Sequence, residues 1–268
     1  MISNRYIVLA VLVTLFSRNV TSQDSAKKRL IDSPRHHEWV TVKQDSRNVE
    51  CFVVYPEVKE KVPAVLVIHE NRGLTDWVRS VADQLAEAGY IAIAPDLLSG
   101  MAPGGGKTND FPDQDAARDA IYKLAPEQVM KDLKAAGDYG MQLPACNGKL
   151  VVAGFCWGGS QAFNFAAHAK NLSASFVFYG TASDNPEDFK TIQCPVYGFY
   201  GENDARVNST VPATAENMKA ADKVFEPVTY TGAGHGFMRS GEDAAPDSAD
   251  KKARDEAWKR WLDLLGKI

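Results

Sequence analysis

A glycine-bounded turn, Gly154-Phe-Cys-Trp-Gly-Gly159, constrains the fold of this chain more than any other feature. An apolar β-rich run ends at Ala153, just ahead of the turn, and a run with helical spacing follows it. A strand-to-helix turn this tight leaves room only for small residues at the positions of Gly154 and Gly158. The pattern therefore predicts that Cys156 stands above the carboxyl end of a strand. Taken alone, it is equally compatible with a glycine-rich connection that carries an incidental cysteine.

Strand-like and helical runs alternate along the chain, which predicts a mainly parallel central sheet flanked by helices. Short apolar runs typical of buried strands lie at 64–69, 90–94, 149–153, 174–179, 195–200 and 227–230. Helical spacing occurs at 77–88, 127–141, 161–170 and 250–265. The β-rich runs 39–42 and 49–55 predict antiparallel N-terminal strands at one edge of the sheet. Residues 98–115 are expected to form a glycine-containing loop, and whether it closes over a site as a mobile lid stays open.

The N-terminus has the pattern of a secretory signal peptide over residues 1–22. A basic residue precedes an apolar run from Tyr6 to Phe16, and small residues precede Gln23. The alternative is an uncleaved anchor, but this run is much shorter than the roughly 20 residues that cross a bilayer. We therefore expect an exported protein, periplasmic or secreted, without a stable membrane anchor. Residues 23–35 are expected to be a polar, solvated leader, and 36–268 a single α/β domain.

Composition narrows the possible partners. The formal net charge is −4 and the basic residues form no long run, so nucleic acid binding is not expected. No metal-ligand spacing of Cys or His occurs, and we expect neither a metal nor an organic cofactor. The residues leave the oligomeric state open, with a monomer favoured. Export would permit disulfides among Cys51, Cys146 and Cys194, whereas Cys51 and Cys194 lie in apolar runs typical of buried free thiols.

Two residues further along the chain strengthen a catalytic interpretation of Cys156. In α/β-hydrolases a nucleophile, an acid and a histidine follow one another in the chain, each after a strand. The run 195–200 leads into Asp204, and the next strand-like run leads into His235, which glycines flank. Glu202 is a rival for the acid, but Asp204 ends its loop and has the shorter, stiffer side chain. The order predicts a Cys–His–Asp triad on an α/β-hydrolase fold.

From about residue 63 to the C-terminus, the chain resembles the dienelactone hydrolase family, the carboxymethylenebutenolidases. The segments that carry the likeness are Val67–Leu74, Ala94–Leu97, Arg118–Leu124, Gly154–Gly159 and Gly234–Arg239. A cysteine in the turn, together with His69-Glu70 at the end of an early strand, is specific among α/β-hydrolases, most of which carry serine. The resemblance implies an α/β-hydrolase fold and a hydrolase that acts on ester bonds.

The resemblance also implies roles around the thiol. Glu70 matches the carboxylate that meets the nucleophile thiol and helps to deprotonate it when substrate arrives. Asn71 and Trp157 match the residues whose backbone N–H groups form the oxyanion hole. Two departures bear on the substrate: His69 stands where some members carry glutamine, and Trp157 is bulkier than the usual aliphatic residue.

The substrate implied by the resemblance is an anion. Arg118 and Arg239 match two arginines that grip a substrate carboxylate, and Tyr122, one turn after Arg118, is expected to line the same pocket. The predicted reaction is hydrolysis of a carboxylate-bearing lactone or activated ester through a thioester on Cys156. One alternative is a broad-specificity exported carboxylesterase or sugar-ester esterase. Another, of a different class, is a non-catalytic carboxylate-binding protein built on a hydrolase scaffold.

Overall fold

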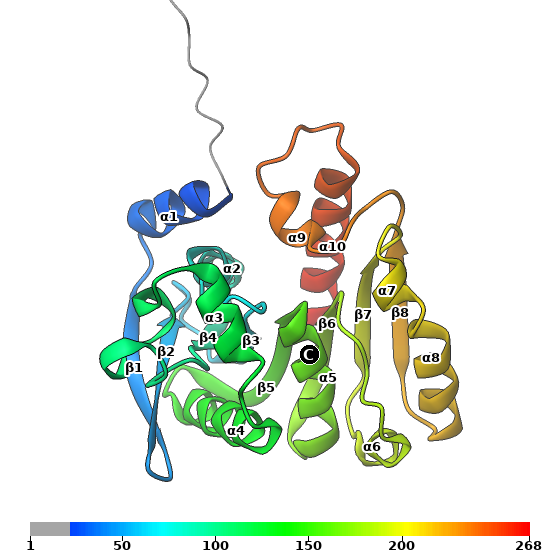
Figure 1. Cartoon of the computed structure of the whole chain (residues 1–268), viewed down its shortest axis with the longest axis horizontal. Helices are drawn as coiled ribbons and strands as arrows, with labels where there is room; N and C mark the ends of the chain where they lie inside the picture. The colour runs from blue at the N-terminus through cyan, green and yellow to red at the C-terminus, as the bar shows by residue number, and fades with distance from the viewer. Residues whose placement is uncertain (1–21) are drawn as a thin grey trace, which may run out of the picture.

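The computed structural model describes residues 22–268, so the predicted signal peptide lies outside the described residues except for Ser22. The chain folds around an eight-stranded sheet with the order β1-β2-β4-β3-β5-β6-β7-β8 (Figure 1). The strands are β1 (His37–Gln44), β2 (Arg47–Val54), β3 (Val62–Ile68), β4 (Ile91–Pro95), β5 (Cys146–Phe155), β6 (Leu172–Phe178), β7 (Val196–Gly201) and β8 (Phe225–Tyr230). The six predicted buried runs all form strands of this sheet.

The directions and order of the strands indicate where on the sheet a ligand site is expected. β2 pairs antiparallel with both β1 and β4, and the remaining pairs are parallel. The antiparallel N-terminal strands are therefore confirmed at one edge. β3 pairs with β4 on one side and with β5 on the other, so the chain order reverses between β3 and β5. In open α/β sheets ligands bind at the carboxyl ends of the strands at such a reversal.

Helices cover both faces of the sheet (Figure 1). They bury apolar side chains against each face. One face is covered by α1 (Ser22–Asp32), α2 (Asp76–Glu87) and α10 (Ala249–Leu265). The other face is covered by α4 (Pro126–Gln142), α5 (Trp157–His168), α6 (Pro186–Thr191) and α8 (Val211–Ala220). Shorter helices lie in the connections: α3 (Gln114–Ile121), α7 (Ala205–Asn208), α9 (Phe237–Ser240), η1 (Pro103–Gly105) and η2 (Thr108–Asp110).

The expectation of a solvated leader at 23–35 is wrong, because most of this segment is helix α1, packed against α2. Ala26 and Leu30 are only 2% and 8% exposed and join the core on that face of the sheet. The side chain of Gln23 also accepts a hydrogen bond from the Trp77 backbone N–H at 3.2 Å. Because residues four positions apart lie on the same face of a helix, Ala26 and Leu30 form one small apolar face. The polar residues around them hide this face in the sequence.

Residues 98–115, expected to be a loop, contain two 3₁₀ turns and the start of α3, and are tied to the body of the domain. Thr108 donates its N–H and its hydroxyl to the Asp96 carboxylate at 3.0 and 2.7 Å. The same hydroxyl oxygen accepts the Leu74 N–H at 3.0 Å. Among the described residues that line the pocket around Cys156, none belongs to 98–115.

All four cysteines are free thiols, which resolves the pairing that the sequence leaves open. Cys51, Cys146 and Cys194 are buried, whereas Cys156 is partly exposed. Burial raises the pKa of the Cys51 thiol well above its usual range and that of Cys194 to about 11. These two thiols stay protonated at neutral pH and behave as small apolar core residues. Within residues 22–268, no helix is long and apolar enough to cross a membrane.

Candidate active site

Cys156 lies in a strained turn between β5 and α5. Its φ and ψ angles are 57° and −117°, a conformation that costs a non-glycine residue about 1–3 kcal/mol. A Cβ atom at Gly154 would lie 1.9 Å from the Gly158 carbonyl oxygen, and one at Gly158 would lie 2.3 Å from the His69 carbonyl oxygen. The turn therefore requires glycine at both predicted positions. It lifts Cys156 above the carboxyl end of β5, and the Cys156 N–H is anchored to the Phe178 carbonyl oxygen at 3.0 Å.

The imidazole of His235 bridges Cys156 and Asp204. Its Nε2 is 3.1 Å from Cys156 Sγ, and its Nδ1 is 2.5 Å from Asp204 Oδ2. Asp204 is only 6% exposed, and it follows β7 as His235 follows β8. The rival acid, Glu202, is exposed and instead accepts the Gly232 N–H at 2.7 Å. The structure thus brings together the predicted nucleophile, base and acid at distances that suit proton transfer.

The charge state of His235 is coupled to the thiol. The pKa of this imidazole is raised to about 9 from its ordinary 6.5. The largest cause is the hydrogen bond to the Cys156 sulfur, which the charged imidazolium donates; the hydrogen bond to Asp204 adds to it, and partial burial opposes both. The hydrogen bond to the Cys156 sulfur therefore stabilises the protonated form of His235.

We expect an NMR titration of His235 to show an apparent pKa near 9. After iodoacetamide alkylates Cys156, this pKa should fall toward 6.5, because a thioether cannot accept the hydrogen bond as a thiolate does. Since the folded-state pKa lies above the ordinary value, the interaction stabilises the fold fully below pH 6.5 and is lost as the pH rises through about 9. An imidazole pKa that does not move on alkylation would contradict the coupling.

The two predicted oxyanion-hole residues lie beside the thiol. Asn71 follows β3 and Trp157 begins α5, and both line the same pocket as Cys156. Within residues 22–268, neither backbone N–H donates to another protein group. The Trp157 N–H is also at a helix N-terminus, where the helix dipole favours negative charge. Both donors are free to bind a developing oxyanion.

The pocket around the thiol has a volume of about 520 Å³ and lies at the carboxyl ends of the parallel strands. Its lining residues come from several connections: Glu70, Asn71, Arg72, Tyr122, Cys156, Trp157, Ser160, Tyr179, Thr181, Arg206, His235 and Arg239. Arg239 donates from Nε to Glu70 Oε2 at 2.8 Å, and the negative charge of Glu70 raises the pKa of Arg239. In this structure the buried Glu70 carboxylate is therefore held by Arg239, with no hydrogen bond to Cys156 among the described residues.

Comparison with known proteins assigns the family. The model of the dienelactone hydrolase family matches residues 49–268. The chain belongs to the dienelactone hydrolase family. It is 30% identical, over 75% of its length and 76% of the relative, to a Salmonella typhimurium protein provisionally named carboxymethylenebutenolidase. It is 28% identical, over 86% of its length and 96% of the relative, to a Bradyrhizobium protein provisionally named 2-oxo-3-(5-oxofuran-2-ylidene)propanoate lactonase.

Solved structures confirm the predicted fold. A crystal structure of a provisionally assigned dienelactone hydrolase from Klebsiella pneumoniae has a TM-score of 0.76 at 24% identity, over 87% of this chain and 99% of that chain. The mixed sheet with flanking helices is therefore the α/β-hydrolase fold. As a member of the dienelactone hydrolase family, the chain is a carboxymethylenebutenolidase-like hydrolase that acts on ester bonds.

One arginine implied by the resemblance to this family does not reach the pocket. The Arg118 guanidinium pairs with Asp115 at 2.9 Å and with Asp119 at 3.2 Å on its own helix α3, and Arg118 does not line the pocket. Arg118 matches the family motif in sequence, but the carboxylates of Asp115 and Asp119 bind its guanidinium in place of a substrate carboxylate. Tyr122 lines the pocket as predicted, and its hydroxyl accepts a hydrogen bond from Asn71 Nδ2 at 3.2 Å.

Sequence reasoning missed two arginines of the pocket. Arg206 lies on α7, two positions after Asp204, and is exposed. Arg72 follows the oxyanion-hole residue Asn71 and donates to Gln114 Oε1 at 2.5 Å. In the part of the chain that the structure describes, neither guanidinium pairs with a carboxylate. Their closeness in sequence to predicted site residues was the one signal that could have revealed them.

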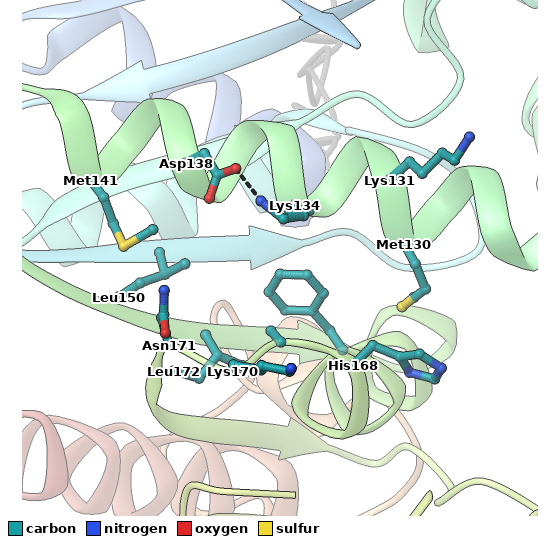
Figure 2. A pocket seen from close by; sticks show the side chains of 12 residues that line it. Met130, Lys131, Lys134, Asp138, Met141, Leu150, His168, Lys170, Asn171 and Leu172 are labelled. Carbon is teal, nitrogen blue, oxygen red and sulfur yellow. Dashed lines mark hydrogen bonds and ion pairs between the residues drawn. The ribbon is translucent and has the colours of Figure 1, made fainter. Parts of the chain in front are cut away.

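A second groove lies at the opposite ends of the strands, between α4 and the end of α5, and Figure 2 shows it. Its volume is about 470 Å³, and its apolar side chains include Met130, Met141 and Leu150. Lys134 at its edge is paired with Asp138 at 2.5 Å. Among the described residues that line it there is no serine, threonine or cysteine that could act as a nucleophile. The pocket around Cys156, by contrast, contains a thiol within hydrogen-bond distance of an imidazole.

Proposed function

We propose that this protein hydrolyses a carboxylate-bearing lactone or activated ester through a thioester on Cys156. The observation that carries the proposal is the imidazole of His235, hydrogen-bonded to both Cys156 and Asp204, inside a cationic pocket. A nucleophile, its base and an acid that orients the base are the groups that acyl transfer requires. The name of the Bradyrhizobium relative supports the substrate class, since it describes a furanone ring joined to a carboxylate.

Substrate docking follows from the charges in the pocket. Arg206 has no carboxylate partner within the described chain, so it can bind a substrate carboxylate without first losing an ion pair. Arg239 is shared, because its guanidinium already binds Glu70. A substrate carboxylate that approaches Arg239 competes with Glu70 for the guanidinium. Glu70 is then released, and in the role that the family resemblance implies it takes any proton that is still on the Cys156 sulfur and passes it to His235, which leaves the thiolate–imidazolium pair.

In the acylation step the substrate acyl group is transferred to Cys156. The Cys156 thiolate attacks the carbonyl carbon, and a carbon–sulfur bond forms while the carbonyl electrons move onto oxygen. The N–H groups of Asn71 and Trp157 stabilise that oxyanion. Collapse of the intermediate breaks the ring carbon–oxygen bond, and the leaving oxygen takes a proton from the His235 imidazolium. A thiolate is itself readily expelled from the tetrahedral intermediate, so acylation requires that the other leaving group is also a good one. An enolate meets this requirement, whereas the nitrogen of an amide does not.

Deacylation returns the enzyme to its starting state. Neutral His235, held by Asp204, takes a proton from water while the water oxygen attacks the thioester carbon. The carbon–sulfur bond breaks, the Cys156 thiolate leaves, and the ring-opened acid is released. His235 is again protonated and paired with the thiolate. No atom outside the substrate and water is consumed, so the proposed cycle needs no cofactor.

The charge selectivity of the pocket tests the proposed substrate class. We expect kcat/KM for an anionic dienelactone to fall on the order of 10- to 100-fold in Arg206→Met, since a hydrogen-bonded charge pair contributes about 1.5–3 kcal/mol. A matched neutral methyl ester should be almost unaffected. Arg118→Met is the control, because Arg118 is paired outside the pocket and its loss should leave both rates unchanged. If Arg206→Met and Arg118→Met both hydrolyse the anionic lactone and the neutral ester with equal kcat/KM, the alternative function, a broad-specificity carboxylesterase, would be favoured instead.

A further inference from the structure

His69 is completely buried at the end of β3, and both of its ring nitrogens are engaged. Nδ1 is 2.7 Å from the Glu70 carbonyl oxygen, and Nε2 is 3.3 Å from the Leu97 N–H. A carbonyl oxygen only accepts and an N–H only donates, so the proton must be on Nδ1 and the ring must be neutral. Burial agrees with this, because it lowers the pKa of His69. A neutral ring with both nitrogens bonded has no proton to exchange with a substrate.

The Nδ1 hydrogen bond of His69 acts on one half of the oxyanion hole. The Glu70 C=O and the Asn71 N–H are opposite ends of one planar peptide group, and the described chain has no cis peptide bonds. His69 Nδ1–H and, at 3.3 Å, the Gly73 N–H both donate to the C=O end. Because the peptide is planar and trans, holding its C=O end also sets the direction of the Asn71 N–H.

The ring of His69 also contacts the other half of the oxyanion hole. It stacks on the Trp157 indole, with ring centroids 5.7 Å apart and planes inclined by 15°. The backbone at Gly158 passes so close to the His69 carbonyl oxygen that a Cβ atom there would lie 2.3 Å from it. His69 therefore contacts Trp157 directly and holds the peptide group of the Asn71 N–H through the Glu70 carbonyl oxygen.

We infer that His69 is a positioning residue that holds the Asn71 and Trp157 N–H groups in the geometry that a tetrahedral oxyanion requires. The inference rests on the proposed function, because the hole matters only if a carbonyl is attacked. His69 does not line the pocket, so it acts through its neighbours and not on the substrate. Its effect is confined to steps in which negative charge develops on a carbonyl oxygen.

The test separates carbonyl attack from thiol reactivity. His69→Leu removes both ring hydrogen bonds, whereas His69→Asn places an amide N–H close to the position of Nδ1 and can still donate to the Glu70 carbonyl. Loss of one oxyanion donor costs on the order of 100- to 1000-fold in kcat. For the anionic lactone we expect kcat to fall about 100-fold in His69→Leu and about 10-fold or less in His69→Asn, with KM changed by less than about threefold.

Alkylation of Cys156 by iodoacetamide is the matched control reaction. It displaces iodide at a saturated carbon and builds no oxyanion on a carbonyl, so its rate should stay within about twofold of wild type in both variants. If His69→Leu fails to fold, His69→Met replaces it, because its flexible apolar side chain can fill the buried space and has no N–H to donate to the Glu70 carbonyl.

Two results would overturn the role of His69: a wild-type kcat in the variant that cannot donate, or alkylation that slows in parallel with turnover. The second result would mean that His69 supports the whole site as an ordinary core residue. A wild-type protein that alkylates normally but hydrolyses neither lactones nor esters would instead overturn the proposed function.

Discussion

Replacing Cys156 with alanine should lower kcat/KM for an anionic dienelactone by about 10⁴-fold or more, since loss of a catalytic nucleophile removes most of the rate enhancement. The substituted side chain is shorter only by the sulfur atom, and the backbone keeps the φ of 57° that cysteine already tolerates. The fold and the pocket should therefore survive, and the Tm of the variant should stay within a few degrees of wild type. Steady-state kinetics and thermal unfolding check the two statements separately.

Cys194→Ala is the control for that measurement. Cys194 is buried, free, and held protonated by a pKa of about 11, so its loss should leave turnover at the wild-type rate. Turnover by Cys156→Ala that matches wild type would exclude the thioester. In that case the triad geometry would be structural, and hydrolysis would have to occur elsewhere in the protein.

Replacing Asp204 with asparagine should lower kcat about 10³-fold, somewhat less than the effect of such a change in serine proteases. Asp204 accepts a hydrogen bond from His235 Nδ1 at 2.5 Å, which holds the ring with Nε2 toward the sulfur. An amide can donate to Nδ1 instead and stabilise the wrong tautomer. Asparagine still caps α7 as Asp204 does through the Val207 N–H at 3.4 Å, so helix stability should change little.

Glu202→Gln is the matched control, since Glu202 is the other carboxylate in the same loop. Its Oε2 accepts the Gly232 N–H, and an amide oxygen can accept that bond equally well. We expect wild-type kcat from Glu202→Gln, and a His235 pKa that falls in Asp204→Asn because the hydrogen bond to Asp204 helps to raise it. A larger loss of kcat in Glu202→Gln than in Asp204→Asn would reassign the acid.

The parts of this fold that could be predicted are those governed by local pattern. Apolar runs located the strands because strands buried on both faces carry few polar residues. The turn around Cys156 was predictable because steric exclusion at Gly154 and Gly158 leaves a visible mark in the sequence. Asp204 and His235 followed from chain order, since parallel strands deliver their carboxyl ends to one edge of the sheet.

The parts that could not be predicted depend on which partner a side chain chooses. Arg118 had a matching motif, but its charge is taken by Asp115 and Asp119, and only coordinates reveal that competition. Helix α1 was hidden because its buried face consists of little more than Ala26 and Leu30 among polar residues. His69 was noted only as a departure from related sequences. Its stacking on Trp157 joins segments far apart in the chain, and only the structure reveals that contact.

Intact-mass measurement of protein quenched in acid during turnover of an anionic lactone tests the thioester directly. Ring opening releases no fragment, so the adduct should have the full mass of the lactone. We expect it on the peptide that contains Cys156, removable by neutral hydroxylamine, and more abundant in Asp204→Asn if deacylation slows more than acylation. An adduct on any other side chain, or hydrolysis at the wild-type rate by protein whose Cys156 is fully alkylated, would contradict the proposed mechanism.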